Sequence, residues 1–246
     1  MREILADLVA EQQALDQSLQ RAPDRDWKKE TRTSRWSVQD QIAHLAWSER
    51  FAARVLLGDA AAVDEMDAFD DVDAFRAAGV DHWRNRRPQE VIESWRFARA
   101  DVVDALSKLS VDDPVRWLPG EVSARTFASS RLTETWSHGL DIFTALDKEI
   151  IDTPRLHHVA WLGWSTLRAA FEQAGEDYPD PIRVELVGPG YSRWVFGPEG
   201  AEDIVRGQAS DWCRVVVRRL DPADAENLTA TGSAAETALQ VANTSA

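Results

Sequence analysis

Two residues that commonly bind metals lie four positions apart in the segment RLTETWSHGLDIF, namely Glu134 and His138. On an α-helix, side chains at this spacing share a face with their Cβ atoms about 5–6 Å apart, so both can bind one ion. A third residue of this kind, His44, lies in the segment SVQDQIAHLAWSER. Two histidines and a carboxylate are typical ligands of catalytic zinc, whose fourth position is left to water or substrate. The three residues therefore predict a metal site with an open coordination position.

The alternative is that Glu134 and His138 form an ordinary pair on a solvated helix face. Their surroundings favour the metal site, because both segments are rich in apolar residues. These neighbours are Val38, Ile42, Leu45, Phe51, Leu132, Trp136, Leu140, Ile142 and Phe143. A carboxylate buried among such residues is costly unless a cation compensates its charge. The ligand types leave zinc, nickel and iron open as the metal.

Other candidates for chemistry are weaker. His157 and His158 are adjacent, so on a helix they diverge by about 100° and at most one can face a core; His82 is a further isolated candidate. Cys213, the single cysteine, adjoins a run of three valines, which is typical of a buried and inert thiol. One cysteine excludes an internal disulfide and a cysteine-rich zinc site, and favours a reducing compartment. No Gly-x-Ser-x-Gly segment supports a serine hydrolase.

Composition restricts the partners. The chain has 246 residues, 44% of them apolar, a net charge of −14 and a pI near 4.8. Nucleic-acid affinity depends on basic residues that neutralise phosphates, so a nucleic-acid partner is not expected. No stretch approaches the roughly 18 apolar residues that cross a bilayer, and the N-terminal segment reads as an amphipathic helix. We therefore expect a cytoplasmic monomer or homodimer with no membrane partner.

Apolar residues recur at helical intervals in four long segments. They predict helices over about 1–22, 37–57 and 88–109, and a fourth helix that carries Glu134 and His138. Ser37 is the expected N-cap of the helix with His44. Four such helices joined by loops predict an up-down bundle with the metal at one end of its core. The acidic segment 59–81 lacks the spacing of a calcium-binding EF-hand and is expected to be a solvated face.

The pattern changes after the segment GEDYPDP, residues 175–181, which follows a further predicted helix over about 155–174. Apolar residues on both sides of Gly188-Pro189-Gly190 predict a β-hairpin or two adjacent strands over about 182–196. Helices over 207–219 and 233–241 and a strand over 228–232 complete the prediction. The fold class is thus α plus α+β, with a helical bundle over 1–176 and a small α+β domain over 177–246.

The segments RWSVQDQIAHLAWSER and ETWSHGLDI resemble the mycothiol-dependent maleylpyruvate isomerase family. The N-terminal part of that family belongs to the DinB-like group of metal-binding four-helix bundles, and the region after Pro181 resembles its sterol-carrier-like domain. The resemblance implies that His44, Glu134 and His138 bind Zn²⁺ or another divalent metal. It also implies an arginine from the C-terminal domain near the metal, in a Gly-x-x-x-x-x-x-Arg segment. GQASDWCR places Arg214 there, with Arg206, Arg218 and Arg219 as competitors.

The implied function is a zinc-dependent enzyme with the low-molecular-weight thiol mycothiol as cofactor or co-substrate. Such an enzyme would isomerise a cis unsaturated acid by thiolate addition and elimination, with Arg214 as the catalytic residue that binds a carboxylate or a developing enolate. Two alternatives stay open: a mycothiol S-transferase acting on electrophiles, and a non-catalytic module that binds a small ligand. Tryptophans at helical spacing are typical of core packing, and Trp36, Trp47 and Trp136 are also candidate walls of the metal pocket.

Overall fold

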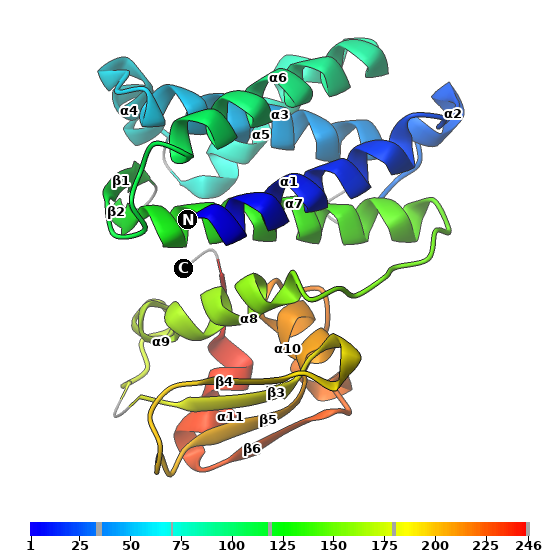
Figure 1. Ribbon diagram of the computed structural model, residues 1–246. Coiled ribbons are helices and arrows are strands. Elements are labelled where there is room, and N and C mark those ends of the chain that lie inside the picture. Colours follow the sequence, from blue (N-terminus) through cyan, green and yellow to red (C-terminus); the bar gives the residue numbers. More distant parts are fainter. Residues whose placement is uncertain (33–35, 70, 118–119, 179–180, 245–246) are drawn as a thin grey trace. The chain divides into compact units, whose positions relative to one another are not determined.

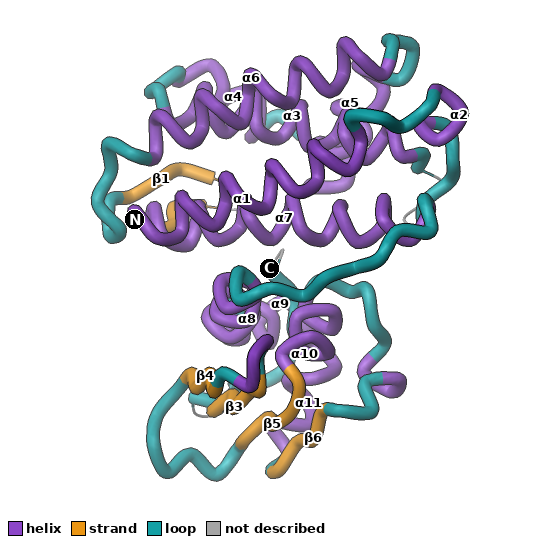
Figure 2. The backbone as a smooth tube through the Cα atoms, turned by 45° about the vertical axis from the view of Figure 1, so that its right-hand side comes forward, coloured by secondary structure: helices purple, strands orange, loops and turns teal. Residues whose placement is uncertain are grey.

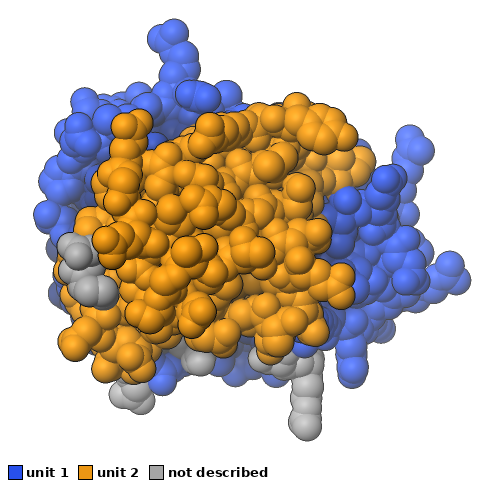
Figure 3. Space-filling model, turned by 90° about the horizontal axis from the view of Figure 1, so that it is seen from below, with its two compact units in different colours: residues 1–150 blue, residues 151–246 orange. Residues whose placement is uncertain are grey.

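The computed structural model describes residues 1–32, 36–69, 71–117, 120–178 and 181–244. Residues 118–119 of the predicted loop before the fourth helix and residues 179–180 of the predicted boundary lie outside this set. The chain forms two compact units, Met1–Ile150 and Ile151–Ala246, which Figure 3 colours separately. No helix in the described part of the chain has the length and apolar character that a membrane span needs.

The first unit is a helical bundle with a small hairpin (Figure 1). Its elements are α1 (Arg2–Leu19), α2 (Asp24–Trp27), α3 (Val38–Leu56), α4 (Ala60–Asp67), α5 (Val72–Trp83), α6 (Pro88–Leu106), β1 (Pro114–Trp117), β2 (Gly120–Ser123) and α7 (Ala124–Ala145). The four long helices pack as two pairs, α3 on α6 and α1 on α7. Their boundaries follow the predicted helices closely, and the predicted fold class is confirmed.

The direction of the helices differs from the expected up-down alternation. In Figure 1, α1 and α7 run one way, while α3 and α6 run the other way. The reason is the acidic segment, which was expected only as a solvated face and forms the two helices α4 and α5. These helices carry the chain from the end of α3 back to the start of α6, so α3 and α6 lie parallel.

Side-chain caps fix where the two ligand-bearing helices begin. Ser37 Oγ accepts a hydrogen bond from the main-chain N–H of Asp40 at 3.2 Å, and Asp40 Oδ2 accepts from the main-chain N–H of Ser37 at 2.9 Å. The predicted N-cap of α3 is therefore confirmed as a capping box. At the start of α7, Ser123 Oγ accepts from the main-chain N–H of Thr126 at 3.1 Å.

The core of the bundle lies between the four helices. Its buried side chains include Leu15, Leu19, Ile42, Leu45, Val91, Ile92, Trp95 and Ile142. A second cluster holds α4 and α5 on α3, where Met66 and Phe75 pack with Phe51. Asp64, Glu65, Asp67 and Asp81 on these helices are exposed, and Glu65 pairs with Arg54 at 2.8 and 2.9 Å. The expectation of a solvated acidic face agrees with this arrangement.

The second unit is a mixed sheet with helices (Figure 2). Its elements are α8 (Leu156–Ser165), α9 (Leu167–Ala174), β3 (Arg183–Val187), η1 (Pro189–Tyr191), β4 (Arg193–Phe196), β5 (Ile204–Gln208), α10 (Ala209–Val216), η2 (Pro222–Asp224), β6 (Leu228–Thr231) and α11 (Ser233–Val241). The strand order is β4-β3-β5-β6, with β3 parallel to β5 and the other pairs antiparallel. Alternate residues of β3 and β4 are buried, as expected for a sheet with one covered face.

Three features of the second unit differ from the expected elements. The helix predicted over 155–174 is broken at Thr166 into α8 and α9. These two helices pack on α10, β4 and α11, so residues 151–176, which were expected in the bundle, belong to the second unit. The helix expected from Gly207 begins at Ala209, because residues 204–208 form β5. A Cβ atom at Gly207 would lie 1.8 Å from the main-chain oxygen of Asn227, so the strand needs glycine there.

Candidate metal centre

The three predicted ligands meet in the first unit. Nε2 of His44, on α3, lies 3.1 Å from Oε2 of Glu134, on α7. Nε2 of His138, one turn further along α7, lies 3.3 Å from the same oxygen. One ligand atom from each residue lies within 4.8 Å of the others, and the described part of the chain holds one such group of His, Cys, Asp or Glu side chains. The structure thus brings together residues that are ninety positions apart in the sequence.

The charge states suit a divalent cation. Burial lowers the pKa of His44 to about 4, so its imidazole is neutral at neutral pH. Burial alone would raise the pKa of Glu134, but hydrogen bonds with His138 and His44 hold it well below its usual range. Metal ligands must be deprotonated, and an ionised carboxylate beside a neutral imidazole already meets this condition.

The separations also suit an ion. In a tetrahedral site with metal–ligand distances near 2 Å, neighbouring ligand atoms lie about 3.3 Å apart. The distances of 3.1 and 3.3 Å from Glu134 Oε2 to the two imidazole nitrogens match this value. Three protein ligands are one fewer than a tetrahedral ion takes, so a position is left for water, thiol or substrate.

A chain of hydrogen bonds lies behind His138. Gln41 Oε1 accepts from Nδ1 of His138, and Gln41 Nε2 donates to Thr31 Oγ1 at 2.7 Å. Gln41 Nε2 also lies 3.5 Å from Oδ2 of Asp141. Thr31 Oγ1 in turn donates to the main-chain oxygen of Trp36 at 2.7 Å. The sequence analysis did not single out Gln41 or Thr31; a glutamine three residues before a candidate ligand on an apolar helix was the available signal.

Trp36 forms one wall of the site. Its ring centroid lies 5.4 Å from that of His44 and 6.1 Å from that of His138, on which it stacks at an interplanar angle of 17°. Of the other two tryptophans expected there, Trp47 packs instead on Phe51 and His82, and Trp136 is buried in α7. The apolar wall of Trp36 lowers the local dielectric and strengthens the charge interactions of the ligands.

A buried arginine, also not singled out from the sequence, lies one turn before Glu134. Arg131 is 3% exposed, and its Nη1 donates to Ser48 Oγ at 2.6 Å. Its guanidinium lies over the rings of Trp117 and Phe127, with 4.8 and 5.5 Å from Cζ to the ring centroids. Among the described residues no carboxylate forms a salt bridge with Arg131. Its positive charge therefore lies between α3 and α7 without a directly bonded counterion.

Glu49, five positions after His44 on α3, carries a buried carboxyl group. Its side chain is fully buried, and neither carboxyl oxygen has a hydrogen-bond partner among the described residues. Burial raises the pKa of Glu49 to about 7, although the charge of Arg131 acts in the opposite direction. The folded protein therefore binds this proton more tightly than the unfolded chain does.

Glu49 is expected to make stability depend on pH. The stabilisation that the folded protein keeps while Glu49 is protonated is fully present below pH 4.5, the usual pKa of Glu. It is lost as the pH rises through about 7. The difference between these values corresponds to about 3 kcal/mol of unfolding free energy. Urea unfolding from pH 4.5 to 8 should show this loss in the wild type, and Glu49→Gln should remove it. Parallel pH profiles of the two proteins would contradict the prediction, since all other groups titrate in both.

Arg214, the predicted catalytic residue, lies on α10 of the second unit. Its Nη1 and Nη2 donate to Oδ2 and Oδ1 of Asp152 at 2.9 and 3.0 Å. The competing Arg206 pairs with Glu185 at 3.0 Å, and Arg218 donates to main-chain carbonyl groups of α11 at 2.9 Å. The catalytic role of Arg214 stays a prediction.

The weaker candidates for chemistry are packed against aromatic rings or buried in the core. His82 lies against Trp47, and His157, in the second unit, contacts the rings of Trp194 and Phe196 at 5.2 and 5.3 Å between centroids. Cys213 is fully buried, and burial raises the pKa of its thiol well above the usual range. A buried thiol that stays protonated is a poor nucleophile, in agreement with the expectation.

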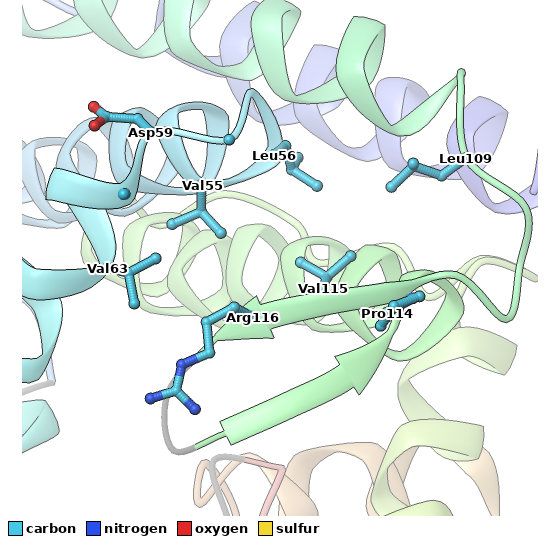
Figure 4. Close-up of a pocket in the computed structure, with 10 residues that line it drawn as sticks. Val55, Leu56, Asp59, Val63, Leu109, Pro114, Val115 and Arg116 are labelled. Atoms are coloured by element: carbon cyan, nitrogen blue, oxygen red, sulfur yellow. The ribbon is translucent and has the colours of Figure 1, made fainter.

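A groove at the other end of α3 is distinct from the metal centre (Figure 4). It is lined mainly by apolar side chains, among them Val55, Val63, Leu109, Pro114 and Val115. Its two charged residues are both engaged, Asp59 with Arg54 at 2.7 Å and Arg116 with Asp67 at 3.2 Å. None of the three candidate ligands lines it, so we assign it no part in the site.

Comparison with known proteins places the chain in a family. The family model named Mycothiol maleylpyruvate isomerase N-terminal domain matches residues 8–143, which include all three candidate ligands and more than half of the chain. The chain belongs to this family. The region matched is the bundle, in which the three candidate ligands lie, and the resemblance inferred from the two ligand segments is confirmed.

Relatives of this chain in the family include uncharacterized proteins from two strains of Mycobacterium tuberculosis. Each is 33% identical over 223 residues, covering 87% of this chain and 84% of the relative. Crystal structures of the mycothiol-dependent maleylpyruvate isomerase, one of them of a mutant, have a TM-score of 0.62 and cover 93% of this chain and 92% of theirs. At 14% and 15% identity, this likeness shows that the fold is shared.

Proposed function

We propose that this family member is a metal-dependent enzyme that uses mycothiol, with zinc as the preferred metal and His44, Glu134 and His138 as its ligands. The observation that carries the proposal is the meeting of two imidazoles and an ionised carboxylate oxygen at 3.1 and 3.3 Å. The names of the family and of its solved structures, which contain mycothiol and maleylpyruvate isomerase, supply the thiol and the reaction class.

Each residue of the site has a defined part. The bound metal would supply a Lewis acid that keeps a coordinated thiol deprotonated at neutral pH. Glu134 contributes the one negative charge of the ligand set, and His44 contributes a neutral nitrogen because burial keeps it unprotonated. Trp36 covers both imidazole rings and limits the access of water from its side.

The preferred reaction is cis-trans isomerisation of an unsaturated acid. The sulfur of the thiolate forms a bond to one carbon of the conjugated double bond, and the π electrons move toward the carbonyl group as an enolate. The remaining single bond rotates, the enolate electrons re-form the double bond, and the carbon–sulfur bond breaks to release the thiolate. The alternative is a mycothiol S-transferase, in which the adduct is the product.

Arg214 is proposed to bind the carboxylate of the substrate. An arginine–carboxylate pair is charge-assisted and contributes about 1.5–3 kcal/mol, so Arg214→Met should raise KM for an acidic substrate roughly 10- to 100-fold. Steady-state kinetics of the metal-loaded protein measure this effect. Asp152→Asn, which removes the observed partner of Arg214 but keeps the guanidinium, is the matched control. An unchanged KM and kcat in Arg214→Met would remove this residue from the mechanism.

The proposed function is tested by anaerobic incubation of the zinc-loaded protein with mycothiol and a panel of cis unsaturated acids and alkylating electrophiles, followed by mass spectrometry. A product of unchanged mass and altered retention time identifies the isomerase, and a persistent thiol adduct identifies the transferase. Both reactions should stop without mycothiol and in the chelated protein. Turnover that needs no metal would contradict the proposal, as would small-ligand binding of full strength by the metal-free protein without any turnover.

A further inference from the structure

The hydrogen-bond chain behind His138 has a fixed direction, which is set at its far end. The main-chain oxygen of Trp36 can only accept, so the Thr31 hydroxyl, 2.7 Å away, donates its single hydrogen to it. Thr31 Oγ1 then has only lone pairs to offer Gln41, 2.7 Å away. The end of the Gln41 amide that faces Thr31 must therefore be the NH₂ group.

Asp141 leads independently to the same orientation of the amide. Its Oδ2 lies 3.5 Å from the same nitrogen of Gln41, and a carboxylate oxygen also requires a donor. Both neighbours on that side thus demand the NH₂ group, which leaves Oε1 facing Nδ1 of His138. An amide oxygen only accepts, so Nδ1 carries a proton. Nε2, the nitrogen 3.3 Å from Glu134, is then the ring nitrogen left to bind the metal.

We propose that Gln41 is a positioning residue that fixes the tautomer and ring orientation of His138, so that Nε2 is the nitrogen that faces the metal. This inference rests on the proposed metal site and identifies the residue that prepares one of its ligands. Ligating histidines generally donate their second N–H to an acceptor, and losing that acceptor typically lowers metal affinity 10- to 100-fold.

Burial makes the role of Gln41 hard to replace. Gln41 is 0% exposed and His138 6% exposed, so bulk water has no easy access to Nδ1. The main-chain oxygen of Trp36, at the far end of the chain, also accepts from the main-chain N–H of Thr31 at 2.7 Å, and the ring of Trp36 stacks on His138. His44 lacks this support, since its buried Nδ1 has no partner among the described residues. The two imidazoles are therefore held unequally.

The test compares the full-length wild type with Gln41→Leu and Gln41→Glu. Long-range ¹H–¹⁵N NMR of the metal-free protein reports which ring nitrogen of His138 carries the proton, and chelator competition measures the Kd for zinc. We expect a protonated Nδ1 in the wild type, loss of this single tautomer in Gln41→Leu, and a Kd raised 10- to 100-fold. A protonated glutamate keeps the acceptor of glutamine and one of its two donors, so Gln41→Glu should keep the Kd within about threefold of the wild type, below the effect of losing the acceptor.

The controls separate this inference from the proposed function. Gln39→Leu changes the same residue type on the same helix, where Gln39 Nε2 donates to the main-chain oxygen of Arg86 at 2.8 Å, and should leave the zinc Kd unchanged. Gln41→Met, which replaces the amide by an apolar side chain of similar length, should also lose the single tautomer and provides the test if Gln41→Leu does not fold. A single Nδ1–H tautomer and an unchanged Kd in folded Gln41→Leu or Gln41→Met would overturn the role of Gln41. Absence of zinc binding by the wild type would instead overturn the proposed function, while the NMR result would still decide the tautomer.

Discussion

Glu134→Gln should deprive the protein of stoichiometric zinc. The substitution keeps the shape of the side chain but removes the only negative charge among the three ligands, whose oxygen lies 3.1 and 3.3 Å from the two imidazole nitrogens. The loss of a direct ligand should exceed the effect of losing an outer hydrogen-bond partner, so we expect zinc affinity to fall by more than about 100-fold. Elemental analysis of the purified protein and chelator competition measure the change. Thiol-dependent turnover should disappear with the metal.

The matched comparison for this prediction uses the histidines. His44→Ala should lose zinc as Glu134→Gln does, because His44 is the only ligand from α3. His82→Ala should retain it, because His82 lies against Trp47 and Trp83 and is not part of the ligand group. Circular dichroism should show that all three variants keep the helical fold. Full zinc content in folded Glu134→Gln and His44→Ala would show that these side chains do not bind the metal.

Asp16→Asn should cause the largest loss of stability among single substitutions at polar sites of the bundle. Asp16, on α1, is nearly buried and accepts hydrogen bonds from Arg96 Nη2 at 2.6 Å and from Arg99 Nη2 at 2.5 Å, both on α6. Removing one partner of a buried ion pair costs about 3–5 kcal/mol because it leaves a buried charge without compensation. Arg96 is 33% exposed and partly screened, so we expect a value near the lower limit, about 3 kcal/mol.

Urea unfolding at pH 7 measures the effect of Asp16→Asn. An exposed pair on the same bundle provides the control, since Lys108 and Asp104 are 2.8 Å apart and more than half exposed; Asp104→Asn should cost under about 0.5 kcal/mol. Although burial acts to raise the pKa of Asp16, the hydrogen bonds and charges of Arg96 and Arg99 lower it overall. Its contribution is therefore present above the usual pKa of Asp and is lost as the pH falls. Equal effects of the two substitutions would contradict a special role for Asp16.

The bundle and its ligands could be read from local patterns. The helix with His44 was recognisable because its apolar residues recur at helical intervals and Ser37 precedes it as a cap, and the capping box confirms this start. Glu134 and His138 were recognisable because one helical turn separates them. These features depend on residues within a few positions of one another, so they are visible without knowledge of the fold.

Features that depend on distant residues were missed. β5 was not expected, because its five residues are paired on both sides by β3 and β6, and their own pattern is short. The break at Thr166 and the assignment of α8 and α9 to the second unit depend on packing against later elements. Gln41 and Thr31 were overlooked for the same reason, since a hydrogen bond from His138 to Gln41 joins residues almost a hundred positions apart.

The sequence by itself determined the family, the helical bundle and the types of the three candidate ligands, because periodicity, caps and the Glu-x-x-x-His spacing are local properties. Only the tertiary structure decided that His44 reaches the same carboxylate oxygen as His138, and that the amide of Gln41 lies behind His138. It also decided the charge states, because the low pKa of His44 follows from burial by surrounding helices. Distances and burial depend on how α3 and α7 pack, and this packing results from the whole core of the unit.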